Sequence, residues 1–216
     1  MNSTTKTILI SGATALVVLV IAAAVFWWFS PMRGMGAFAA GPGDGFGPGF
    51  GARMPGRFMG RGMMREMHAM ADVENEYEFL ANMIPHHEEA VEKATTLRDR
   101  TDREFMREFA AGIIEVQTRE IEQMDAWIDR WYPDRPDRAE YEPMMGDYRG
   151  LRGDRLDVAF LEDMIPHHMA AVMMSQQLIA GDLAEHDGVE ELARTIRDAQ
   201  MREIRDMSRW LEEWGR

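Results

Sequence analysis

Apolar residues recur at helical spacing from about residue 72 to the end of the chain, and no segment there alternates with the period of two typical of a strand. This pattern predicts an all-α domain built from amphipathic helices, each with one apolar face. The predicted helices span residues 72–98, 101–131, 154–180 and 187–214.

Short polar signals predict where these helices begin and end. Asp72 is the expected N-cap of the first helix, and Thr101 with Glu104 forms a capping-box pattern at the start of the second. Tyr132 and Pro133 end the second helix, since proline cannot continue the hydrogen-bond ladder. Gly181 is the expected C′ residue of the third helix.

The second half of this region repeats the first. The segment MIPHH at positions 83–87 returns unchanged at positions 164–168. The pattern QxREIxxMxxWxxxW at positions 117–131 returns at positions 200–214, so the spacing between the repeats has grown slightly. A duplicated helical hairpin packs most simply as a four-helix bundle, and the long connection 132–153 between the hairpins is the ferritin-like kind of crossover.

The N-terminal segment 1–70 has a different character. Residues 7–29 carry no charge and would span about 34 Å as a helix, enough to cross a bilayer. We therefore expect a membrane anchor at 1–30, a flexible Gly/Met/Arg-rich tether at 31–70, and a folded domain at 71–216 outside the cytoplasm. The alternative is secretion after cleavage of a signal peptide close to Ala40.

Charge and sulfur content limit the possible partners. Residues 71–216 hold 18 Lys and Arg against 35 Asp and Glu, which argues against nucleic-acid binding and suits the attraction of cations. The chain has 20 methionines and no cysteine, so it has neither disulfides nor thiolates. Its only sulfur ligands are thioethers.

The repeated motifs carry the candidate chemistry. Met83 lies one helical turn before His86 and His87, so the three side chains form a compact patch, which the second half repeats with Met164, His167 and His168. In a pseudo-twofold bundle the two patches can face each other. The second and fourth helices add equivalent polar and thioether side chains along one face: Gln117, Glu120, Met124, Gln200, Glu203 and Met207. Glu120 and Glu203 are further candidate metal ligands.

Both histidine motifs contain a proline inside a predicted helix. Pro85 and Pro166 each remove a backbone donor, at a cost of about 3 kcal/mol in a helix interior. Each is therefore expected to kink its helix or to mark the point where the helix restarts.

The paired MIPHH motifs, together with the QxREIxxMxxW segments, resemble the bacterial domain-of-unknown-function 305 family over residues 72–214. The resemblance does not extend to the anchor or the tether. It implies a ferritin-like four-helix bundle, and in some members a secreted or periplasmic copper-binding protein. The metal ligands that it implies are His86, His87, His167, His168, Met83, Met164, Met124 and Met207.

The function expected from these features is copper binding, sequestration or handover, not enzymatic catalysis. A di-iron oxidase needs Glu-x-x-His motifs, but Met83 and Met164 occupy the positions three residues before His86 and His167. Iron would have to rely on Glu120 and Glu203, whereas thioether and imidazole favour Cu(I). No nucleophile constellation or nucleotide-binding motif is visible, and the sequence names no protein partner.

Structural explanations for the same residues remain open. The methionines can be core filler, and the histidine pairs can be buried polar groups that hydrogen-bond to Glu120 and Glu203. The protein would then be a metal-free interaction module held at the membrane. His68 and His186 lie outside the repeated motifs and are weaker candidates, and the four C-terminal tryptophans of the repeats are expected to close one end of the bundle.

Overall fold

A computed structural model describes residues 73–135 and 141–214 of the chain. The predicted anchor at 1–30 and tether at 31–70 lie outside these residues. Within the described part, no helix is both long enough and apolar enough to cross a membrane.

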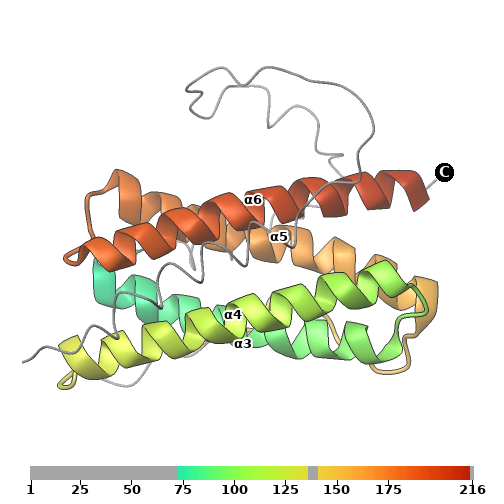
Figure 1. Ribbon diagram of the computed structural model, residues 1–216, viewed down its shortest axis with the longest axis horizontal. Coiled ribbons are helices and arrows are strands. Elements are labelled where there is room, and N and C mark those ends of the chain that lie inside the picture. The colour runs from blue at the N-terminus through green and yellow to red at the C-terminus, as the bar shows by residue number, and fades with distance from the viewer. Residues whose placement is uncertain (1–72, 136–140, 215–216) are drawn as a thin grey trace, which may run out of the picture. The chain divides into compact units, whose positions relative to one another are not determined.

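The described residues form four α-helices arranged as two hairpins, so the predicted all-α class and the duplicated hairpin are confirmed (Figure 1). Within each hairpin the two helices pack along their length, and α3 packs against α5 to join the hairpins. The helices are α3 (Glu76–Arg100), α4 (Glu104–Trp131), α5 (Gly153–Ala180) and α6 (Asp187–Trp214).

Two of the predicted helix starts are wrong. The N-cap of α3 is Asn75, whose side chain accepts a hydrogen bond from the Glu78 amide at 3.0 Å. Thr101 does not cap α4: it is the C-cap residue of α3, and its hydroxyl accepts a hydrogen bond from the Arg103 amide at 3.1 Å. The turn between the helices is so short that Arg103 becomes the N-cap of α4 without a side-chain bond.

Gly181 ends α5 for a different reason from the one expected. Its backbone is right-handed, with φ −84°, and the left-handed residue is Asp182, with φ 52°. A Cβ at Gly181 would lie 2.9 Å from Leu183 Cγ and 3.0 Å from the Gln177 carbonyl oxygen. Close packing of the turn, rather than a positive φ, therefore requires glycine here.

Both histidine helices continue through their prolines. Pro85 lies inside α3 and Pro166 inside α5, with helical residues on each side. The predicted alternative of a helix restart is therefore wrong. Helix packing on both sides supplies the stability that a proline in an isolated helix would remove.

Two apolar clusters fill the bundle, and they are related by the sequence repeat. The Phe79 cluster comprises Val73, Phe79, Leu80, Met83, Ile84, Met124, Ala171, Met174, Leu178, Val189, Leu192, Ala193 and Ile196. The Phe160 cluster comprises Ala90, Ala94, Leu97, Met106, Ala110, Ile113, Met145, Tyr148, Leu156, Phe160, Leu161, Met164, Val172, Ile204 and Met207.

Contrary to the prediction, the four tryptophans do not gather at one end of the bundle. Trp127 and Trp131 pack on the Phe79 cluster, whereas Trp210 and Trp214 pack on the Phe160 cluster. Trp131 is the last residue of α4, and Trp214 contacts Arg103 at the start of α4. Each end of the bundle therefore has its own pair of tryptophans.

The crossover between the hairpins runs back along the bundle. Near its beginning, the Tyr132 hydroxyl donates to Glu76 at the start of α3, at 2.9 Å. Further on, the Tyr148 carbonyl accepts from Arg100 at the end of α3, at 3.5 Å. Because the chain returns to the start of α5 in this way, α4 and α5 run in the same direction, as the predicted single long crossover requires (Figure 1).

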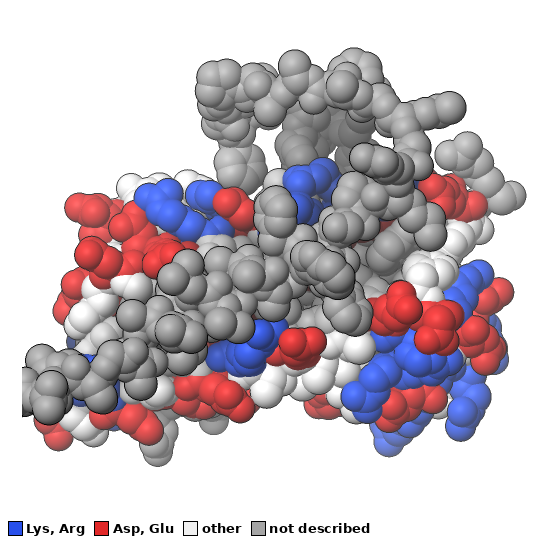
Figure 2. All heavy atoms as spheres, in the orientation of Figure 1, with Lys and Arg blue, Asp and Glu red and all other residues white. Residues whose placement is uncertain are grey.

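The described surface is mainly acidic, but its charges are unevenly spread. Figure 2 shows Asp and Glu along much of the visible face, and Lys and Arg gathered at the end where α3 turns into α4. Many of these basic side chains are already paired, for example Arg103 with Asp154 at 3.0 Å and Arg107 with Glu104 at 3.4 Å.

Candidate metal centre

The four motif histidines meet at mid-bundle and form what we call the histidine layer: His86 and His87 from α3, with His167 and His168 from α5. Each is at most 1% exposed. The rings of His86 and His167 stack, with centroids 3.7 Å apart and planes inclined by 28°. The two motif patches therefore face each other, as the pseudo-twofold arrangement predicted.

The layer lies between the two apolar clusters. Along α3, Met83 and Ile84 belong to the Phe79 cluster, and Ala90 belongs to the Phe160 cluster. Along α5 the order is reversed, since Met164 belongs to the Phe160 cluster and Ala171 to the Phe79 cluster. The histidines thus occupy a polar boundary inside an otherwise apolar core.

Two of the histidines are held by carboxylates from α4 and α6. His87 Nε2 donates to Glu120 Oε2 of α4 at 2.9 Å, and His168 Nε2 donates to Glu203 Oε2 of α6 at 2.6 Å. Glu120 and Glu203 are equivalent in the repeat, so one interaction is built twice. These carboxylates support the rings through hydrogen bonds.

The stacked pair is oriented differently. His86 Nε2 donates to the backbone carbonyl of His167 at 3.0 Å, and a carbonyl can only accept, so the proton is on Nε2. His167 Nε2 lies 3.3 Å from Glu89 Oε2, which is within ion-pair distance but lacks hydrogen-bond geometry. All four Nε2 atoms therefore lie next to an oxygen.

The Nδ1 atoms have no such partner. In all four histidines Nδ1 is buried and makes no hydrogen bond within the described chain. Gln117 Oε1 and Gln200 Oε1, one turn before the supporting glutamates, are buried and unpaired in the same way. An unpaired buried polar atom costs about 1–3 kcal/mol, so this concentration of lone pairs makes the layer a candidate site for an electron-pair acceptor.

Burial keeps the stacked pair neutral. It lowers the pKa of His86 and of His167 well below the ordinary histidine value, and the neighbouring histidines lower both further. A neutral imidazole with its proton on Nε2 presents a lone pair at Nδ1, which is the form that binds metals.

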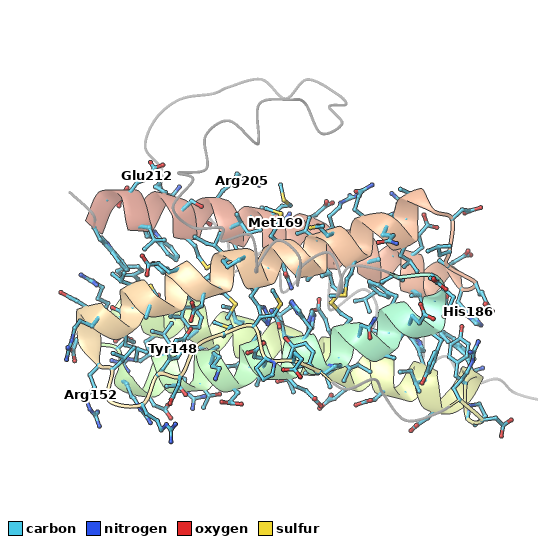
Figure 3. All side chains as sticks on the ribbon, turned by 180° about the vertical axis from the view of Figure 1, so that it is seen from behind. Tyr148, Arg152, Met169, His186, Arg205 and Glu212 are labelled. Carbon is cyan, nitrogen blue, oxygen red and sulfur yellow. The ribbon has the colours of Figure 1, made fainter. Side chains whose placement is uncertain are left out.

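The four predicted methionine ligands do not form one group. Met83 and Met124 lie in the Phe79 cluster, whereas Met164 and Met207 lie in the Phe160 cluster. Of these four methionines, each side of the histidine layer has one from α3 or α5 and one from α4 or α6. Met169, at mid-length of α5 (Figure 3), is only partly buried against the Phe160 cluster.

No three His, Asp or Glu side chains in residues 73–135 and 141–214 converge as a ready-made metal-binding group. The stacking gives a physical reason, because parallel rings direct their nitrogens to the side rather than toward a common point. Methionine sulfur is a further possible donor for a soft ion. The donors present fit a soft ion, provided that a ring turns.

Glu89 was not among the site residues predicted from the sequence. It lies one turn beyond His86, is 6% exposed, and contacts His167. The available signal was a difference between the repeats, since Ala170 occupies the equivalent position in the second half. A difference of this kind shows where the two halves diverge but does not identify the residues that Glu89 contacts.

His186 is not part of the layer. It lies at the end of the bundle beside the α5–α6 turn (Figure 3), where its ring stacks on Trp131 at 3.7 Å. Its Nδ1 contacts Glu76 at 2.7 Å, which is a structural role. His68 lies outside the described residues.

Comparison with solved structures finds a copper-bound protein of similar fold. CopM in its Cu(I)-bound form is 30% identical, with a TM-score of 0.59, over 66% of this chain and 99% of the CopM chain. CopM in its Cu(II)-bound form is 29% identical, with a TM-score of 0.59, over 65% and 97%. A DUF305 protein from Streptomyces coelicolor, provisionally described as secreted, is 28% identical, with a TM-score of 0.57, over 65% and 94%.

The family comparison covers more of the chain than the motifs do. The family described as "Domain of unknown function (DUF305)" matches residues 40–128 and 157–216. The match begins within residues 31–70, so the expectation that the tether stands apart from the family is wrong. No curated protein matches the chain. Two matched segments that include both histidine motifs show that this protein belongs to the DUF305 family.

Proposed function

We propose that this protein binds copper, preferentially Cu(I), at the histidine layer, and that it sequesters the ion or passes it on. The observation that carries the proposal is the set of four buried Nδ1 atoms without partners. Each belongs to a ring whose Nε2 faces an oxygen, and this arrangement is typical of metal-binding histidines with supporting groups.

The donor set favours copper over iron. Glu120 and Glu203 already accept hydrogen bonds from histidines, and the positions three residues before His86 and His167 are methionines. A di-iron site requires several free carboxylates, and these residues do not supply them. Neutral imidazoles with thioethers on both sides suit Cu(I), and imidazole also suits Cu(II).

The likeness to CopM supports the same conclusion, because that protein has been solved with Cu(I), Cu(II) and silver bound. Silver(I) is a soft ion that, like Cu(I), prefers thioether and imidazole donors. The identity is high enough to relate the folds, but the ligands proposed here rest on this chain's own buried atoms.

We propose that ions reach the layer on the side of Glu203. Its side chain is 32% exposed, whereas that of its counterpart Glu120 is 11% exposed. Glu203 therefore links solvent to His168, and an acidic surface raises the local concentration of cations. Such an access point suits uptake and release better than permanent enclosure.

We further propose that the domain, residues 71–216, is a ferritin-like bundle held outside the cytoplasm by an anchor within residues 1–30. Two observations support this location: the uncharged stretch 7–29, and the provisional description of the Streptomyces coelicolor family member as a secreted protein. Protease treatment should remove the domain from intact cells if it lies at the cell surface, or from spheroplasts if it lies in the periplasm. Full-length protein in the soluble cytosol would contradict it, and a mature chain beginning near Ala40 would indicate signal cleavage instead.

The test of copper binding uses the stacked pair, His86→Leu with His167→Leu. Leucine has a volume similar to that of histidine and no ligand atom. The exchange leaves no carboxylate without a hydrogen-bond donor, because Glu89 keeps three other donors. Cu(I) affinity, measured by competition with a chromophoric chelator, should fall by more than about 100-fold, since losing even a supporting partner costs about 10- to 100-fold.

The matched control is His186→Gln, which removes a histidine that lies outside the layer. It should leave Cu(I) affinity within a few-fold of the natural chain. Equal affinity in the natural chain and the double variant would refute the site. Failure of the natural chain to retain Cu(I) would favour the metal-free helical module.

A further inference from the structure

The two halves of the histidine layer differ at one buried position. Glu89, three residues after His86, corresponds to Ala170, three residues after His167. Both positions are buried, so the difference lies inside the core. One half has a fixed carboxylate where the other has only a methyl group.

Glu89 holds the crossover to α3. Its Oε2 accepts from the Tyr141 hydroxyl at 2.5 Å and from the Met144 amide at 3.0 Å. Its Oε1 accepts from the Met145 amide at 2.9 Å. Three donors from one segment of the crossover converge on this carboxylate, and burial of Tyr141 beside it raises the pKa of the tyrosine hydroxyl.

The same carboxylate contacts the histidine layer. Glu89 Oε2 lies 3.3 Å from His167 Nε2, and His167 is the one layer histidine without a hydrogen bond at either ring nitrogen. The other three Nε2 atoms donate to Glu120, to Glu203 and to the His167 carbonyl. The contact has the distance of an ion pair but not the alignment of a hydrogen bond, so a modest turn of the His167 ring would complete that bond.

We propose that Glu89 is a positioning residue for His167 and that, through it, ion binding at the layer tightens the crossover segment 141–148. The proposal rests on the proposed copper function. When His167 Nδ1 takes part in binding, its Nε2–H turns onto Glu89, as the rings of His87 and His168 already rest on their glutamates. Glu89 is in turn held by the crossover, so ring and crossover become ordered together.

This arrangement predicts reciprocity between the crossover and the site. If a bound ion orders the crossover, an ordered crossover must strengthen binding by the same factor. The half without the carboxylate has no such link, because Ala170 cannot accept a hydrogen bond through its side chain. The crossover is therefore the part of the fold from which a partner could sense occupancy of the layer.

The chain supplies a matched control for the test. Asp163 holds the crossover at another point, accepting from the Gly146 amide at 2.9 Å and from the Tyr148 hydroxyl at 3.1 Å. Replacement of Asp163 loosens the crossover without removing the group beside His167. Comparing Glu89→Gln with Asp163→Asn thus separates orientation of the ring from general loosening.

The experiment uses the full-length natural chain and both variants, with and without added Cu(I) or Cu(II). In the natural chain, copper should slow hydrogen exchange at the Met144 and Met145 amides. Glu89→Gln should abolish that protection, weaken copper affinity by about 10- to 100-fold, and change the Cu(II) electron paramagnetic resonance spectrum. Asp163→Asn should speed exchange in the metal-free protein but keep the Cu(II) spectrum of the natural chain.

Tyr141→Phe keeps the carboxylate and removes only one donor, so it serves if Glu89→Gln does not fold. It should reduce the copper-induced protection and leave the Cu(II) spectrum closer to that of the natural chain. Copper binding without any change in exchange at 144 and 145, or Glu89→Gln matching Asp163→Asn in affinity and spectrum, would overturn the proposal. A natural chain that binds no copper would instead refute the proposed function.

Discussion

At the scale of single residues, the centre depends on which nitrogen of each histidine carries the proton. A carbonyl or a carboxylate beside Nε2 keeps the proton there and leaves Nδ1 with a lone pair. Burial lowers the pKa of His86 and His167, so these rings stay neutral without a metal. The proposed site therefore has neutral rings at His86 and His167 in the metal-free protein.

The lowered pKa values predict how the stability of the metal-free protein depends on pH. Below about pH 6.5 the unfolded chain binds protons at His86 and His167 that the folded chain does not. The free energy of unfolding should therefore be fully retained above about pH 6.5 and fall as the pH drops, by at most about 1.4 kcal/mol per pH unit for each histidine. Urea unfolding at a series of pH values measures this slope.

The variant that combines His86→Leu with His167→Leu is the control for the pH dependence. It lacks both groups, so the part of the slope between about pH 6.5 and pH 5 should disappear. An unchanged slope in that window would mean that other groups, rather than the stacked pair, take up the protons.

At the scale of the helices, α3 and α5 each begin with a buried carboxylate that binds the turn of the other hairpin. Glu76 of α3 accepts from the Glu185 and His186 amides in the α5–α6 turn, at 2.7 and 2.8 Å. Its counterpart Asp157 of α5 accepts from Arg103 in the α3–α4 turn, at 3.1 Å. The two hairpins are thus fastened at both ends by equivalent contacts.

Glu76→Gln tests this fastening. The amide cannot accept from all of the donors that now point at Glu76, so we expect a loss of about 1–3 kcal/mol in the free energy of unfolding. Copper affinity should be unchanged, because the layer lies further along α3. Glu78→Gln, on the same turn with a more exposed partner, is the matched control and should cost less. Equal losses in both variants would argue against a special role for Glu76.

At the scale of the whole molecule, neither hairpin is complete by itself. The histidine layer takes two side chains from each half, and α3 buries its inner face against α5. The contact between Gln177 and the Val73 carbonyl, at 3.0 Å, joins the start of α3 to the end of α5. Each half therefore lacks part of its packing surface without the other.

A single half should consequently fail as an independent domain. Residues 71–135 expressed alone would expose the face of α3 that now packs on α5, so we expect an unfolded or self-associating hairpin. Sedimentation and urea unfolding, with residues 71–216 as the matched control, check this. A monomeric half that unfolds cooperatively would contradict it.

The local pattern of the sequence determined the helices and the repeat. Apolar periodicity placed all four helices and found both ends of α6, because helix formation follows from spacing along the chain. The repeated motif identified the four histidines and the helices that bring them together. Glu120 and Glu203 recur at equivalent positions one helix away, and their predicted alternative role as hydrogen-bond partners of the histidines is the one seen in the structure.

Contacts between residues far apart in the chain were decided only by the tertiary structure. The role of Glu89 depends on a distant crossover segment, and that of Glu76 on a turn in the other hairpin. The separation of the methionines and tryptophans into two clusters has the same origin, because direction along the bundle is set by antiparallel packing of α3 and α5. Spacing within a helix predicts which side chains share a face, but only packing decides what that face meets.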